Sequence, residues 1–153
     1  MIPNKVMYDI PAQDPNPIQF HKSEVQFRFS KRVAITKWIE TVVRMGGKKV
    51  GSINYIFCTD AFLVFINKQY LKHNYYTDII TFDYSERKTV NGEIYISIDR
   101  VKENATSFGV TFPVELNRVI IHGVLHLLGY TDKTAAQKTL MRKKEDACLS
   151  LLK

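Results

Sequence analysis

The order of hydrophobic and polar residues predicts four strands in this chain. In residues 24–29 apolar and polar positions alternate, as in a strand with one buried face. Residues 52–59 and 79–84 are rich in β-branched and aromatic side chains, which favour strands. Residues 93–98 alternate again, with three isoleucines on one side. Three prolines between residues 11 and 17 predict a loop before the first of these strands.

Apolar residues at helical spacing predict five helices. The first carries Ile35, Trp38, Ile39, Val42 and Met45, with Ser30 as a candidate cap and two glycines at its end. The others are predicted over residues 60–71, 99–108, 111–128 and 134–152. Thr59 or Asp60 can cap the second helix, and Pro113 suits the first turn of the fourth. The sequence thus predicts an α/β or α+β fold, a small mixed sheet packed with several helices.

Composition favours one globular domain over residues 1–153. Hydrophobic residues make up 45% and charged residues 24% of the chain, which is ordinary for a protein with a buried core. We expect no membrane contact and a cytoplasmic location, because there is no long apolar run and no segment typical of a signal peptide. Cys58 and Cys148 lie in apolar contexts far apart, and we expect both to be reduced thiols of the core.

The formal net charge of +7 favours an anionic partner such as nucleic acid. Eight basic residues lie between Lys22 and Lys49, and five lie between Lys133 and Lys144, where no acid occurs. The alternative is that these are only two solvated helix faces.

One polar stripe crosses the otherwise apolar helix predicted over residues 111–128. At 100° per residue, Glu115, Arg118, His122 and His126 share this stripe. The Cα atoms of the two histidines lie about 6 Å apart along the axis, so both rings can reach one cation. Gly129 suits the left-handed residue that ends a helix, after which Asp132 can return beneath the rings.

These features predict a metal site at the end of a buried helix. His122, His126 and Asp132 would supply two imidazoles and a carboxylate, which is a known set for catalytic zinc and leaves one position for water. The spacing is that of an extended zinc motif of proteases, but Gly123 stands where those enzymes place their glutamate base. The sequence therefore disfavours a peptide hydrolase.

Several segments together resemble one family, the YbeY endoribonucleases or rRNA maturation factors. The stretch HGVLHLLGYTD, which starts at His122, is similar to the family's H-G-x-L-H-L-x-G-Y-D-H segment. Upstream, INKQYLKHNYYTDIITF and GEIYIS are similar to the family segments L-N-x-x-Y-R…T-[DN]-V-L-S-F and G-D-I-x-I-S. Met141, Glu145 and Leu149 match its ending, so the resemblance covers about residues 55–152.

This resemblance implies a metal-dependent endoribonuclease that processes ribosomal RNA and acts in small-subunit maturation and ribosome quality control. It implies one divalent ion, most simply zinc, and partners that include ribosomal RNA, the small subunit and its assembly factors. Asp132 replaces the family's third histidine, and Leu71 replaces an arginine that is thought to help catalysis. Lys72, His73 or Arg118 could substitute, and we assign Lys72 and Arg118 as candidate catalytic residues.

Two other functions stay open at this point. The metal could instead tie a helix end to a loop in a non-catalytic ribosome-assembly module, although a structural zinc usually has four protein ligands. A hydrolase for another small phosphate or ester substrate is also compatible with the sequence. Tyr75, Tyr76 and Tyr95 could stack on unpaired bases, or they could be packing residues.

Overall fold

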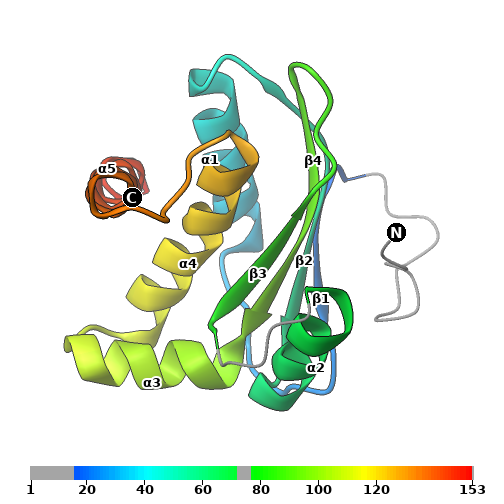
Figure 1. The fold of residues 1–153 in the computed structure, drawn as a ribbon, viewed down its shortest axis with the longest axis vertical. Coiled ribbons are helices and arrows are strands. Elements are labelled where there is room, and N and C mark those ends of the chain that lie inside the picture. The colour runs from blue at the N-terminus through cyan, green and yellow to red at the C-terminus, as the bar shows by residue number, and fades with distance from the viewer. Residues whose placement is uncertain (1–15, 72–76, 153) are drawn as a thin grey trace.

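The computed structural model describes residues 16–71 and 77–152, which form a four-stranded sheet and five helices (Figure 1). The strands are β1 (Ile18–Lys22), β2 (Lys49–Cys58), β3 (Ile79–Asp83) and β4 (Thr89–Ser97). The helices are α1 (Arg32–Met45), α2 (Asp60–Tyr70), α3 (Ile98–Phe108), α4 (Phe112–Leu127) and α5 (Ala135–Leu149).

The sheet is mixed, which confirms the predicted α/β class. Its strand order is β1-β2-β4-β3, with β1, β2 and β4 parallel and β3 antiparallel to β4. The parallel pairs require crossover connections, which α1 and α2 provide. The central strands β2 and β4 each lie between two other strands with helices over both faces, and the second half of β2 and most of β4 are buried.

Helices cover both faces of the sheet, and each face has its own apolar cluster. The larger cluster joins α1, α4 and α5 to one face and contains Ile94 and Ile96. The smaller cluster joins α2 to the other face and contains Tyr95, Cys58 and Ile80. Tyr95 is fully buried, so it is a packing residue and cannot stack on a base from solution. Cys58 and Cys148 are buried and free, as predicted.

The strand predicted over residues 24–29 is wrong, and β1 was missed. Residues 25–30 belong to no strand, although Val25, Phe27 and Phe29 do pack against the core as their alternation indicated. Phe27 and Phe29 both contact the ring of Phe57, with ring centroids 5.1 Å away in each case. Their side chains are partly buried by aromatic packing, while β1 (Ile18–Lys22) makes the backbone pairing with β2.

Most predicted helix starts are confirmed. The hydroxyls of Thr59, Thr111 and Thr134 accept the hydrogen bonds that cap α2, α4 and α5. Ser30 is not a cap: α1 begins after Lys31, which has a left-handed φ of 59° and makes no capping side-chain bond. Met45 is exposed and not part of the apolar stripe of α1. No helix in the described ranges is long and apolar enough to span a bilayer.

Candidate metal centre

Helix α4 presents its polar stripe to a cleft, while most of its other residues after Val114 are buried in the core. Val119, Ile120 and Val124 are among its buried residues, whereas Arg118, His122 and His126 line the cleft. Gly123 lets the helix lie directly against the sheet, since a Cβ atom there would stand 2.9 Å from Cδ1 of Ile94. A strand of the sheet therefore approaches α4 closely at Gly123.

The chain reverses after α4 and brings Asp132 back to the two histidines, as the sequence predicts. Gly129 has a φ of +104°, in the region that favours glycine, and its N–H donates to the carbonyl of His126 at 2.9 Å. Oδ2 of Asp132 then lies 3.3 Å from Nε2 of His122 and 3.6 Å from Nε2 of His126. The two Nε2 atoms are 3.0 Å apart. We call these three residues the metal triad.

The spacing of the triad fits a tetrahedral ion. Ligand atoms at about 2.0–2.1 Å from a tetrahedral zinc lie about 3.3–3.4 Å from one another. The three measured separations of 3.0, 3.3 and 3.6 Å bracket that value. His122, His126 and Asp132 could therefore hold one metal ion through one face of a tetrahedron, with the fourth corner left for another ligand.

Glu145 of α5 orients the ring of His122 from behind. Its Oε2 lies 2.5 Å from Nδ1 of His122, which directs Nε2 toward Asp132. The other oxygen of Glu145 accepts a hydrogen bond from Nη1 of Arg118 at 2.8 Å, and Nη2 of Arg118 donates to Asp146 at 2.6 Å. A carboxylate on the far nitrogen of a ligating histidine fixes the tautomer and the ring orientation. Helices α4 and α5 are thus joined at the site by charged hydrogen bonds.

The two histidines have opposite pKa shifts. Burial lowers the pKa of His122, but the hydrogen bond to Glu145 and the nearby carboxylates outweigh it, so this pKa is raised overall. Burial, followed by the charge of His122, lowers the pKa of His126 and keeps that ring neutral. Burial would raise the pKa of Glu145, but its bonds to His122 and Arg118 lower it. In the absence of metal, protonation of His122 is therefore favoured over protonation of His126.

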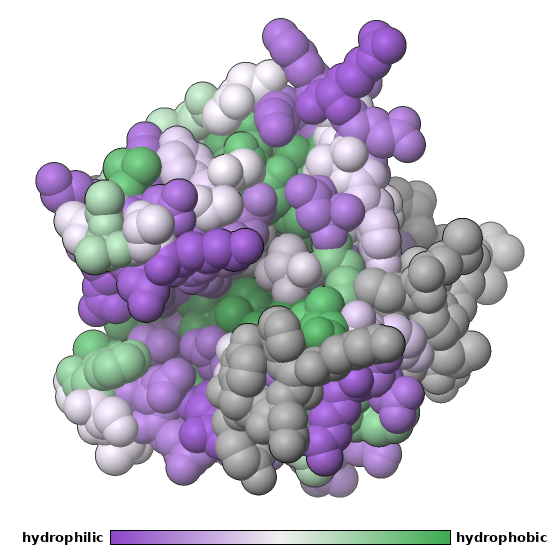
Figure 2. All heavy atoms as spheres, viewed as in Figure 1, coloured by the Kyte–Doolittle hydropathy of each residue, from purple (hydrophilic) through white to green (hydrophobic). Residues whose placement is uncertain are grey.

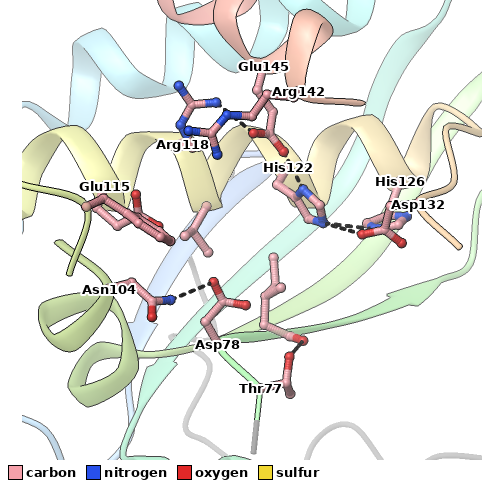
Figure 3. Close-up of a pocket in the computed structure, with 13 residues that line it drawn as sticks. Thr77, Asp78, Asn104, Glu115, Arg118, His122, His126, Asp132, Arg142 and Glu145 are labelled. Carbon is pink, nitrogen blue, oxygen red and sulfur yellow. Dashed lines mark hydrogen bonds and ion pairs between the residues drawn. The ribbon is translucent and has the colours of Figure 1, made fainter. Parts of the chain in front are cut away.

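The triad opens onto a cleft of about 510 Å³ between α3, α4, α5 and the start of β3 (Figures 2 and 3). Figure 3 shows His126 and Asp132 at one end and Glu115 and Asn104 at the other. Asp78 lies on the wall opposite Arg118 and accepts a hydrogen bond from Asn104 at 3.4 Å. Burial raises the pKa of both Asp78 and Glu115.

Of the two predicted catalytic residues, Arg118 and Lys72, the structure describes only Arg118. Arg118 lines the cleft, but its guanidinium is engaged by Glu145 and Asp146. Lys72, like His73, Tyr75 and Tyr76, lies outside the described residues. Leu71 follows α2, is 37% exposed and lines a neighbouring pocket beside His126. A catalytic role for Arg118 or Lys72 stays a prediction.

Sequence reasoning assigned no role to two acidic residues of the site, Glu145 and Asp78. Both lie in segments that match the resembled family, but the match alone does not say what they contact. A signal for Glu145 was present, because it stands between Met141 and Cys148 on the buried side of α5. A buried acid on an apolar stripe usually has a charged or hydrogen-bonding partner, which here is His122 together with Arg118.

Comparison with known proteins places the chain in a family. The family model described as endoribonuclease YbeY matches residues 18–153. A Cytophaga hutchinsonii protein named endoribonuclease YbeY is 49% identical over 137 residues, which cover 89% of this chain and 96% of the relative. A Flavobacterium psychrophilum protein of the same name is 50% identical over 128 residues, covering 84% and 91%. The solution structure of a Thermotoga maritima protein is 28% identical with a TM-score of 0.59, covering 87% and 89%. The chain therefore belongs to the endoribonuclease YbeY family.

Proposed function

We propose that this protein is a metal-dependent endoribonuclease whose ion is held by His122, His126 and Asp132 in a single domain. The observation that carries the proposal is the spacing of the triad, which fits one tetrahedral ion at the end of an open cleft. The curated relatives named endoribonuclease YbeY supply the reaction class. Zinc is the proposed ion, because two imidazoles and one carboxylate are ligands that it commonly takes.

When bound, the ion would polarise a phosphate oxygen, lower the pKa of a water molecule, or both. The protein's own residues prepare the site for this. Glu145 holds the His122 ring with Nε2 facing the triad, and Arg118 holds Glu145. The lowered pKa of His126 favours the neutral imidazole, which has one unprotonated nitrogen to offer a metal.

We propose ribosomal RNA as the substrate, with roles in small-subunit maturation and ribosome quality control in the cytoplasm. The small subunit and its assembly factors are the proposed partners. The support is the family resemblance together with the surface beside the cleft. There α5 and the preceding loop carry exposed Lys133, Lys138, Arg142, Lys143 and Lys144, which suit a phosphate backbone.

The decisive experiment compares three forms of the protein on a structured ribosomal RNA fragment. These are the chelated protein, the same protein after metal is restored, and Asp132→Ala. We expect cleavage only by the restored wild-type protein, with the rate of Asp132→Ala reduced by more than 100-fold. Equal cleavage by all three forms would exclude metal catalysis.

The alternative is an assembly module in which the metal only ties the end of α4 to the loop that carries Asp132. It is disfavoured by the ligand count, because only three candidate ligands cluster within the described residues and a structural zinc usually has four. Thermal melting with and without chelator separates the two functions. Strong destabilisation without nuclease activity would support the module, and lost activity with a nearly unchanged melt would support the enzyme.

A further inference from the structure

The half of the cleft away from the metal triad has a chemical character of its own. It contains Asn104 and Phe108 from α3, Glu115 from α4 and Arg142 from α5. Asn104 and Phe108 are four residues apart on one helix, so they share a face. Figure 3 shows Asn104 and Glu115 together at this end, with Arg142 on the wall above. We call these four residues the distal group.

Phe108 is an aromatic residue left open to solvent inside a polar cleft. Its exposed fraction is 56%, while the aromatic rings of the sheet are buried among one another. Within the described part of the chain no ring contacts it closely enough to stack. An exposed flat ring in a cleft suits a ligand with a flat face, and unpaired nucleobases stack on such rings.

Arg142 differs from the other arginine of the cleft. Arg118 is fixed by two carboxylates, at 2.8 and 2.6 Å. Arg142 lies one turn before Glu145 on α5, is exposed, and has no ion pair with any acid among the described residues. Its guanidinium is therefore available to a ligand, and its planar donors match the oxygens of a phosphate.

The acidic residues determine which part of a ligand can lie at the far end. Glu115 and Asp78 repel a phosphate, but their carboxylate oxygens accept hydrogen bonds from the amino and imino groups of bases. Asn104 can both donate and accept. A phosphate is favoured nearer Arg142 and the triad, and a base is favoured beside Phe108. The cleft of about 510 Å³ is in the size range of small-ligand pockets and suits one nucleotide rather than a duplex groove.

We propose that the distal group is a nucleotide subsite, in which a base stacks on Phe108 and Arg142 binds the adjoining phosphate. This inference deepens the proposed endoribonuclease function and rests on it. It assigns base recognition to α3 and phosphate binding to α5, separate from the metal ligands on α4 and its loop.

The first test measures binding of an unstructured 2′-O-methyl oligoribonucleotide to the full chain by fluorescence anisotropy. We expect Phe108→Ala to weaken binding roughly 5- to 100-fold, the range found for loss of one stacked base. Phe108→Trp should retain affinity because it keeps a flat ring, and Phe108→Leu should lose it although it stays apolar. The matched control is Val114→Ala, which truncates an exposed apolar residue that does not line the cleft and should change nothing.

A double-mutant cycle that combines Phe108→Ala with removal of one base from the ligand tests stacking on Phe108 directly. A series of the same oligonucleotide carries one abasic residue at each successive position. At the position that occupies the subsite, base removal should weaken binding to wild type but not to Phe108→Ala. If the two losses are additive at every position, or if Phe108→Leu binds as tightly as wild type, the stacking role is overturned.

The phosphate contact is tested by the dependence of binding on salt. We expect Arg142→Met to reduce the slope of log affinity against log salt concentration by about 0.7, the value for one phosphate of a single strand. Arg142→Lys should keep most of the slope because it keeps the charge. Arg44→Met on α1 removes an exposed arginine outside the cleft and is the control. An equal loss of slope in Arg142→Met and Arg44→Met would overturn the assignment.

These measurements separate the subsite from the reaction. Coupling between Phe108 and a base without any metal-dependent cleavage by wild type would support the subsite and contradict the endoribonuclease proposal. Metal-dependent cleavage without such coupling would support the endoribonuclease proposal and contradict the subsite.

Discussion

The two ends of the cleft are built in opposite ways. At the triad end each histidine already has a partner, and Glu145, which holds His122, is itself held by Arg118. At the distal end Phe108 is more than half exposed, and Arg142 has no ion pair with the described acids. The side chains at the triad end are held by other side chains of the protein, whereas Phe108 and Arg142 at the distal end are open to solvent and to a ligand.

The difference matches what the two proposed ligands require. A metal ion has short bonds and a fixed ligand geometry, so errors of a few tenths of an ångström in ligand position are costly. A nucleotide is larger, and its stacking and ionic contacts tolerate small displacements. We therefore expect substitutions behind the triad to change metal affinity, and substitutions in the distal group to change RNA affinity.

The largest expected effect in this comparison belongs to Glu145→Gln. Glutamine keeps the shape but removes the charge that fixes His122, and loss of such a partner typically costs 10–100-fold in metal affinity. Competition with a chromophoric chelator measures the change directly, without any activity assay. We expect no effect of Phe108→Ala in the same assay.

Asp146→Asn is the matched control for Glu145→Gln. Asp146 also pairs with Arg118, but its side chain is 60% exposed and does not contact His122. We expect its metal affinity to change less than threefold, because exposed ion pairs contribute little. Equal losses in the two variants would mean that Arg118, rather than Glu145, carries the effect.

A smaller effect, on stability, is expected for Gly123→Ala, at the point where α4 packs on the sheet. In Gly123→Ala the new methyl group would stand 2.9 and 3.0 Å from two atoms of Ile94, an overpacking that costs about 1–3 kcal/mol. The better helix propensity of alanine offsets about 1 kcal/mol. We expect a net loss of about 1 kcal/mol in the free energy of unfolding, measured by denaturant titration.

Ile94→Val provides the internal check on Gly123→Ala. Valine lacks the Cδ1 atom that the new methyl group would meet, so the double variant should be more stable than the sum of the two single changes predicts. Strict additivity would show that the helix and the sheet do not meet as the structure has them.

The smallest expected effect is a pH dependence of the metal-free protein. The raised pKa of His122 gives stability that is present below pH 6.5 and is lost as the pH rises through that raised value. The lowered pKa of Glu145 gives stability that is present above pH 4.5 and is lost as the pH falls. The melting temperatures of wild type and Glu145→Gln should therefore differ most between pH 4.5 and 6.5.

In that pH range the wild type should have the higher melting temperature. Saturating metal should remove the His122 part of the pH dependence, because the ion would replace the proton on His122. A difference in melting temperature between wild type and Glu145→Gln that keeps growing above pH 8 would contradict the pKa shifts assigned to His122 and Glu145.

Local sequence signals predicted the elements that have strong caps and long apolar stripes. The threonines before α2, α4 and α5 and the apolar residues of α4 determined where these helices run. The alternation in residues 24–29 predicted burial correctly but not pairing, because alternating side chains can pack on a core without a ladder of backbone hydrogen bonds. Strand β1 has only five residues and pairs with a distant segment, so nothing local indicated it.

The candidate site shows the same distinction between local signals and contacts of distant segments. The helical period and Gly129 were enough to bring His122, His126 and Asp132 together, since all three lie within eleven residues of chain. Glu145 comes from another helix, and its bond to His122 spans 23 residues. Asp78 and Phe108 reach the cleft from further elements, and no local pattern states that they meet.

By itself, the sequence determined the family, the α/β class and the grouping of His122, His126 and Asp132, because each depends on motifs or on the geometry of one helix and its turn. Only the tertiary structure decided that Arg118 is held by two carboxylates while Arg142 is not, and that Phe108 faces a polar cleft. The physical reason is that burial and charge pairing depend on which elements pack together, and packing joins residues that the chain keeps far apart.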